Sequence, residues 1–225
     1  MRDGRRVRGT PFSLRSIPGD SSGNLRAVLP RQRIVELLAP HCDIATRLNA
    51  VPSSARVRGI YFRSALEEVT RRGLRSAFET VIHETERSAF MLYPAADYIV
   101  WLAWAGSLVA SPRNVHAGMR ELSRGNAVYF GQSLLGRSLI RLLSRDPVQL
   151  LHQAIKSKRA VTNYGRWIIA AEGPRHVVVR HEEEFVWIES ALLGAALGAL
   201  ESCGISPSVE VKLTNPYNGD LIFRW

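Results

Sequence analysis

Cysteine and lysine are scarce in this chain. Its 225 residues include two cysteines, Cys42 and Cys203, which lie far apart in the sequence. Such a pair does not predict the disulfide framework that many small secreted domains use, so we expect two buried thiols in a reducing, cytoplasmic compartment. Basic residues number 30, but only 3 of them are lysines. This preference for arginine weakens any argument from charge alone for nucleic-acid binding.

Long apolar segments are also lacking. The two most apolar stretches, residues 98–110 and 186–200, are shorter than the roughly 20 residues that a transmembrane helix needs, and the second contains Glu189. The arginines near the N-terminus are not followed by an apolar run before Pro18, which disfavours a signal peptide. With 46% apolar residues the composition is that of a globular protein. We therefore expect a soluble protein with no membrane span.

The net charge of +10 is unevenly distributed. Residues 1–56 contain 10 arginines and 4 acidic residues, a net charge of +6, which leaves +4 for the remaining residues. Residues 1–27 combine Arg, Gly, Ser and Pro with few large apolar side chains, a composition that does not fold alone. We predict a disordered basic arm over residues 1–27 and a single domain over residues 28–225. The arm supports one alternative function, nucleic-acid binding.

The spacing of apolar residues predicts a mainly helical first part. Asp43 and Asp146 are placed to cap helices, and Ser64 with Glu67 resembles a capping box. A short β-prone run at residues 57–62 interrupts the helices. The predicted helices cover residues 31–39, 44–48, 64–73, 74–87, 94–111, 122–143 and 147–159.

The last third of the chain has a different pattern. Residues 161–170 and 176–185 are β-branched or alternating runs joined by Gly173 and Pro174, which predicts a hairpin. A helix over residues 188–203 follows, and residues 209–213 and 221–225 predict a second hairpin. The predicted fold class is α+β, with a helical N-terminal part packed on a small C-terminal antiparallel sheet in the order hairpin, helix, hairpin. Gly194 and Gly198 give the helix a small-residue face for close packing or, as a second interpretation, for a homodimer.

No group of residues in the sequence indicates a catalytic or metal site. His176 and His181 lie five residues apart in a predicted strand, so their side chains point to opposite faces. The run from Glu182 to Glu184 is interpreted as a solvated rim at the end of a strand. Ser133 lacks the second glycine of a nucleophile elbow. The sequence favours a protein that is not an enzyme and has no cofactor or metal.

A basic cluster and an aromatic cluster remain as candidate sites. Lys156, Lys158, Arg159 and Arg166 are interpreted as a solvated helix end, with contact to phosphate groups as the alternative. The aromatic side chains of residues 98–104 are interpreted as core, with the lining of a small-molecule pocket as the alternative. The predicted ligand-binding residues, should that pocket exist, are Tyr61, Trp101, Trp104, Arg137, Asn163 and Tyr164.

Several short motifs, in order, resemble those of the Myxococcus-paralogous family of unknown function, a myxobacterial family. They are the segment around Gly59, Ile60 and Tyr61, the Tyr93-Pro94 pair, the stretch 131–137, the Asn163-Tyr164 pair and the closing Phe223-Arg224-Trp225. The resemblance covers residues 43–225. It implies membership of the family and no particular activity.

The order of elements also resembles a wider group of domains. Helices followed by a hairpin, a small-residue helix and a terminal hairpin are similar to the haem nitric-oxide/oxygen-binding domain, to 4-vinyl-reductase-type ligand domains and to TRAPP subunits. In the haem proteins an iron-ligating histidine lies on the helix before the sheet, and His152 has a comparable place. The Tyr-x-Ser-x-Arg element that holds the haem propionates is missing from this sequence, which disfavours haem.

Together these features predict a sensor or signalling domain without enzymatic activity. Its expected partner is a small apolar ligand or another protein. The alternatives are an enzyme that acts on a small apolar substrate and a nucleic-acid-binding protein.

Overall fold

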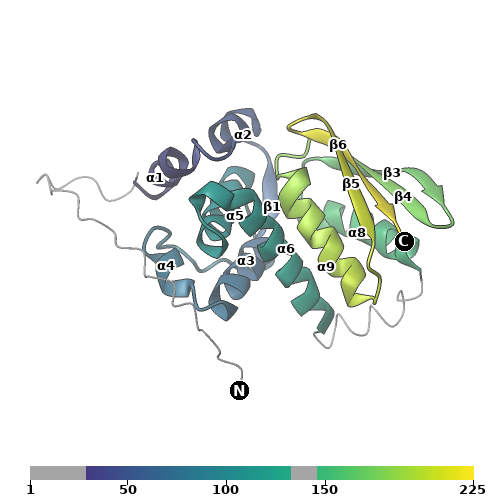
Figure 1. Ribbon diagram of the computed structural model, residues 1–225. Helices are drawn as coiled ribbons and strands as arrows, with labels where there is room; N and C mark the ends of the chain where they lie inside the picture. Colours follow the sequence, from purple (N-terminus) through teal and green to yellow (C-terminus); the bar gives the residue numbers. More distant parts are fainter. Residues whose placement is uncertain (1–28, 133–145) are drawn as a thin grey trace, which may run out of the picture.

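The computed structural model describes residues 29–132 and 146–225. A helical part precedes an antiparallel four-stranded sheet, and the two lie side by side (Figure 1). The predicted α+β class is therefore confirmed. The predicted arm over residues 1–27, together with Ser133 and Arg137, lies outside the described residues.

The helical part begins with α1 (Leu29–Leu38) and α2 (Ile44–Ala50). Asp43 directly precedes α2, as predicted, but its side chain makes no capping hydrogen bond. It accepts hydrogen bonds from Arg47 Nε at 3.0 Å and from Trp187 Nε1 at 2.6 Å instead. The side chain of Asp43 thus links α2 to the C-terminal part of the chain.

A small ribbon follows α2. β1 (Arg56–Arg58) pairs antiparallel with β2 (Leu92–Pro94), and α3 (Gly59–Arg71) begins directly after β1. The predicted extended run over residues 57–62 is therefore wrong beyond residue 58. A Cβ at position 59 would lie 2.1 Å from the backbone oxygen of Ser88, so only glycine allows this close approach at the first turn of α3.

The second predicted helix of this region is much shorter than expected. α4 (Arg75–Glu79) ends well before residue 87, where the sequence pattern placed the end of the helix. The chain then returns to β2, and the amide of Gly59 donates to the backbone oxygen of Met91 at 2.9 Å. The chain after α4 therefore leads back to the ribbon and does not continue as a helix to residue 87.

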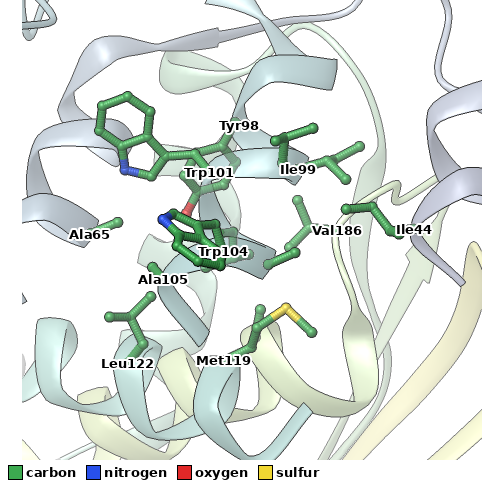
Figure 2. Close-up of a cluster of buried hydrophobic side chains, with 14 of the residues drawn as sticks. Ile44, Ala65, Tyr98, Ile99, Trp101, Trp104, Ala105, Met119, Leu122 and Val186 are labelled. Carbon is green, nitrogen blue, oxygen red and sulfur yellow. The ribbon is translucent and has the colours of Figure 1, made fainter. Parts of the chain in front are cut away.

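The centre of the helical part is α5 (Ala95–Val109), which is buried along most of its length. A short 3₁₀ turn, η1 (Pro112–Asn114), leads to α6 (Val115–Gln132). Figure 2 shows Trp101 and Trp104 of α5 among buried apolar side chains that include Ala65 and Leu122. The interpretation of these tryptophans as core residues is consistent with this position.

The C-terminal part begins with α8 (Pro147–Val161). The carboxylate of Asp146 accepts hydrogen bonds from the amides of Val148 and Gln149, which confirms the predicted cap. Next come β3 (Arg166–Gly173) and β4 (His176–Glu182), a π-helical turn η2 (Ile188–Leu192), α9 (Leu193–Ser202), β5 (Ser208–Asn215) and β6 (Asn218–Arg224). The hairpin, helix, hairpin order is confirmed, although β3 begins only at Arg166 because α8 continues to Val161.

The sheet has the strand order β3-β4-β6-β5, so the two hairpins join through β4 and β6. Val177, Val179 and His181 alternate along β4 on the buried face of the sheet. On β6 they lie opposite Phe223, Leu221 and Gly219 respectively. His181 therefore occupies a position in a row of otherwise apolar or small residues.

The two parts of the molecule meet where α6 lies against α9 (Figure 1). A Cβ on Gly194 would lie 2.2 Å from the backbone oxygen of Arg120, and a Cβ on Gly198 would lie 2.3 Å from that of Arg124. The small-residue face of this helix therefore serves close helix packing, as predicted.

Two further observations concern the expectations from composition. In residues 29–132 and 146–225, no helix is long and apolar enough to cross a membrane. Cys42 and Cys203 are free, but both are only partly buried rather than fully buried as expected. Burial still raises the pKa of the Cys42 thiol to about 11, which makes this thiol a poor nucleophile at neutral pH.

Candidate functional site

A cavity of about 360 Å³ lies between α8, α9 and the buried face of the sheet. Its walls are mostly apolar and include Leu151, Ile155, Val179, Leu221 and Phe223. Small side chains of α9, such as Ala195, Ala196 and Ala199, leave the space that larger residues would fill. Gln153, Ala154 and Ser157 of α8 also line the cavity and are exposed, so the cavity opens to the surface at this helix.

A buried ion pair lies at the inner end of this cavity. The ammonium of Lys158 on α8 lies 2.5 Å from Oε2 of Glu184, and the two side chains are only 5% and 1% exposed. Glu184 also accepts hydrogen bonds from Trp167 Nε1 at 2.8 Å and from the amide of Val186 at 3.3 Å. Because both charges are paired and hydrogen-bonded, their burial is tolerated.

Aromatic rings surround the ammonium. Its nitrogen lies 4.4 Å from the ring centre of Tyr164 and 5.1 Å from that of Trp167, distances at which a cation is attracted to a ring face. Glu184 and these rings hold Lys158 in one place. The end of the cavity is therefore polar but carries no net charge from this pair.

A smaller chamber of about 50 Å³ adjoins the ion pair. Tyr61, Lys158 and Trp167 line both the chamber and the larger cavity, so the two spaces are neighbours. The rings of Tyr61 and Tyr98 meet edge to face at 5.6 Å, and Tyr164 completes the aromatic wall. Among the described residues, none of the three tyrosine hydroxyls has a hydrogen-bond partner.

These tyrosine hydroxyls remain protonated at neutral pH. Burial, reinforced by the negative charge of Glu184, raises the pKa of Tyr61 to about 12. Burial likewise raises the pKa values of Tyr98 and Tyr164, with smaller contributions from the neighbouring tyrosines and Glu184. All three hydroxyls can therefore donate a hydrogen bond to a molecule in the chamber.

His181 supplies a further polar group in the cavity wall. Burial is the main reason why its pKa is lowered to about 4, so the imidazole is neutral at physiological pH. Its ring meets the edge of Trp167 at 5.2 Å. Within the described part of the chain, no hydrogen bond of ordinary geometry reaches its Nδ1. The Nδ1 of this neutral imidazole can donate or accept one hydrogen bond, according to which ring nitrogen carries the proton.

The structure brings together two of the predicted ligand-binding residues and separates the others. Tyr61 and Tyr164 line the chamber, whereas Trp101 and Trp104 lie in the core of the helical part and do not line either cavity. Asn163 is exposed and hydrogen-bonded to the backbone of residues 54 and 56. It borders a wide, polar surface hollow of about 870 Å³ instead. Arg137 lies outside the described residues.

The structure corrects the sequence interpretation of Lys158 and Glu184. Both were assigned to solvated surfaces, Lys158 to a basic helix end and Glu184 to an acidic rim, but both are buried. A signal was present in each case: Lys158 continues the apolar row of Leu151 and Ile155 at helical spacing, and Glu184 directly precedes the apolar run 185–188. The predicted basic cluster is further reduced because Arg166 pairs with Glu182 at 2.5 Å.

The chain belongs to a family described as "Protein of unknown function (DUF2378)", whose model matches residues 50–225. No match was found among curated proteins. Among solved structures, the chain is similar to the unliganded Fe(II) H-NOX protein from K. algicida, with 14% identity, a TM-score of 0.58 and coverage of 74% of this chain and 95% of the other.

Two further solved structures are similar to this chain. A point mutant of the K. algicida protein shares 12% identity at a TM-score of 0.60, with coverage of 74% and 95%. A double mutant of the Tt H-NOX protein shares 13% identity at a TM-score of 0.51, with coverage of 75% and 94%. At these identities the likeness establishes an H-NOX-like fold and leaves the function of this chain open.

The residues present do not fit a haem held by His152. The side chain of His152 is 42% exposed, its Nε2 lies 3.2 Å from a carboxylate oxygen of Glu172, and it does not line the cavity. His181 does line the cavity, but it lies on a strand and not on the helix before the sheet. In the two described stretches, no group of three or more His, Cys, Asp and Glu residues is placed to hold a metal ion.

Proposed function

We propose that this protein is a sensor domain that binds a small, mainly apolar molecule in the cavity between α8, α9 and the sheet. The observation that carries the proposal is the cavity itself, which combines apolar walls with a polar inner end. Its volume of about 360 Å³ is within the usual range of small-molecule sites. The H-NOX-like fold supports the same class of function as an analogy.

The packing of the rest of the molecule supports a binding role for this space. Protein interiors are normally packed as densely as organic crystals, and an unfilled apolar space costs its lining side chains their contacts. Here the small residues of α9 keep the space open, whereas the neighbouring α6–α9 contact is so close that it requires glycine. The same helix therefore packs tightly on one side and leaves room on the other.

The chemistry of the lining residues favours binding over catalysis. Lys158 and Glu184 neutralise each other, and the tyrosine hydroxyls and His181 are neutral at physiological pH. An enzyme is the second candidate, and the buried ion pair next to a histidine of lowered pKa is the observation that favours it. Chemical conversion of a bound molecule, detected by mass spectrometry, would identify the enzyme.

Calorimetric titration of the purified protein with n-decanol tests the proposal. We expect saturable binding with a negative heat-capacity change, the sign of apolar surface leaving water. Ala196→Phe places a ring in the cavity and is expected to abolish binding. Ala160→Phe, at an exposed position of α8 that does not line the cavity, is the matched control and is expected to bind as the unaltered protein does. Equal binding by both variants would contradict the proposal.

A further inference from the structure

We propose that the ligand is an elongated amphipath whose head group is uncharged and accepts hydrogen bonds, such as an alcohol or a ketone. The head would occupy the 50 Å³ chamber beside the ion pair, and the apolar chain would occupy the 360 Å³ cavity. This inference rests on the proposed function and adds the chemical class of the ligand.

The balanced charges of Lys158 and Glu184 at the inner end of the cavity exclude a ligand with a charged head group. The ammonium of Lys158 is already neutralised by Glu184 at 2.5 Å, and both side chains are almost fully buried. A carboxylate or ammonium head would therefore bring a third charge without a counter-charge into a site removed from water, which is costly. A neutral head leaves the pair intact.

The hydrogen-bonding groups of the chamber are mostly donors. The hydroxyls of Tyr61, Tyr98 and Tyr164 stay protonated and lack partners in the described part of the chain. The ammonium of Lys158 has three donors, of which Glu184 takes one. A head group with oxygen lone pairs matches this excess of donors, and a purely apolar molecule leaves them unsatisfied.

The sizes of the two spaces set the shape of the ligand. A volume of 50 Å³ holds only a few non-hydrogen atoms, which suits a hydroxyl or carbonyl with its first carbon and is too small for a ring system. The larger space is lined mainly by aliphatic and aromatic side chains of α8, α9 and the sheet. Tyr61, Lys158 and Trp167 border both spaces, so one molecule can occupy them together.

A panel of three probes with the same chain tests the head-group class. n-Decanol, decanoate and decylammonium are titrated separately into the full-length protein at pH 7.5 by calorimetry. At this pH the acid and the amine are both ionised. We expect n-decanol to bind at least about tenfold more tightly than either ion, the factor that corresponds to roughly 1.4 kcal/mol.

Removing one charge of the Lys158–Glu184 pair is expected to change which head group the protein binds most tightly, in a direction set by the charge that remains. Glu184→Gln leaves the ammonium of Lys158 without a counter-charge, so decanoate should gain at least about tenfold in affinity over its binding to the unaltered protein. Lys158→Met leaves Glu184 uncompensated, and decylammonium should gain instead. These opposite shifts would not arise from a general loss of packing.

Tyrosine variants keep the test independent of whether the charge variants fold. Tyr98→Phe with Tyr164→Phe removes two donors, keeps both rings and is expected to weaken n-decanol binding by about tenfold. Tyr93→Phe, on β2 against the core of the helical part and lining neither space, is the matched control and is expected to leave affinity unchanged.

The outcomes separate this inference from the proposed function. Equal affinity of the unaltered protein for n-decanol and for either ion would overturn the head-group assignment and leave the cavity as a ligand site. No binding of any probe would overturn both. Unchanged n-decanol affinity in the tyrosine double variant would also overturn the head-group assignment.

Discussion

Arg47 is a buried arginine that joins α2 to the segment preceding η2. Its side chain is 1% exposed and lies 3.0 Å from Asp43 and 3.7 Å from Glu189. Its guanidinium also donates to the backbone oxygen of Phe185 at 3.3 Å and lies 4.9 Å from the ring centre of Trp187. The helical part and the C-terminal part therefore share one charged, hydrogen-bonded contact.

Replacing Arg47 is expected to be strongly destabilising. Arg47→Met keeps much of the apolar stem but leaves the partly buried carboxylates of Asp43 and Glu189 without their cation. We expect a loss of about 3 kcal/mol in the free energy of unfolding, measured by urea denaturation. The control Arg75→Ala breaks an exposed pair with Glu79 and should cost less than about 1 kcal/mol. Equal losses in both variants would contradict the role assigned to Arg47.

His181 predicts a specific dependence of stability on pH. Its pKa is about 4 in the folded protein because burial disfavours the charged form, whereas an unfolded histidine titrates near 6.5. Between these values the unfolded chain binds more protons than the folded one, so stability falls as pH decreases from 6.5 towards 4. Between pH 7.5 and pH 5 this group should cost about 2 kcal/mol.

The variant His181→Gln isolates this effect because glutamine does not titrate. Urea denaturation of both proteins at several pH values measures the difference, which should shrink or reverse as the pH is lowered. A difference in unfolding free energy that stays constant from pH 7.5 to pH 5 would show that His181 is not buried in its neutral form.

The individual residues of the site were only partly predictable. Tyr61 and Tyr164, two of the predicted ligand-binding residues, line the chamber of the candidate site, but Lys158, Glu184 and His181 were assigned to surfaces or left without a role. Charged residues are normally exposed. The pairing that reverses this preference joins Lys158 of α8 to Glu184, which lies two residues after β4 and 26 positions along the chain. A single sequence contains the apolar row that includes Lys158 but does not reveal its partner.

The contact between α6 and α9 shows how glycine can determine helix packing. A Cβ on Gly194 would lie 2.2 Å from the carbonyl oxygen of Arg120, and a Cβ on Gly198 would lie 2.3 Å from that of Arg124. Alanine is the better helix former, by about 1 kcal/mol. Since the clash is with backbone atoms, however, no side-chain rotation relieves it, and the two helices must separate.

We therefore expect Gly194→Ala to destabilise the protein by about 2 kcal/mol despite its gain in helix propensity. Thermal and urea denaturation both measure this change. Thr70→Ala at an exposed position of α3 is the control and should change the free energy of unfolding by less than about 0.5 kcal/mol. A stabilised Gly194→Ala protein would mean that the two helices do not approach as closely as described.

Helices and strands were predicted best where local patterns agree with the tertiary contacts. The two C-terminal hairpins and the helix between them follow from alternation and turn residues, and α8 follows from its Asp146-Pro147 start. The prediction failed at residues 59–62, which begin α3, and at residues 80–87, where the helix does not continue. There Gly59 starts a helix because the chain around Ser88 and Met91 packs against it, a contact that the local pattern does not contain.

The described residues form two groups of buried apolar side chains, one in the helical part and one under the sheet. Leu192 contacts both groups, α6 lies against α9, and the segment of residues 184–187 carries Glu184 of the ion pair and Trp187 of the Arg47 contact. Such a connection predicts that the two parts unfold together.

Ligand binding is therefore expected to stabilise the whole chain as one unit. With n-decanol at 100 times its dissociation constant, the free energy of unfolding should rise by about 2.7 kcal/mol. Circular dichroism at helix wavelengths and tryptophan fluorescence should report one coincident transition that moves to higher temperature, and Ala196→Phe should show no such shift. Two transitions, of which only one responds to n-decanol, would show instead that the sheet with α8 and α9 unfolds independently of the helices before it.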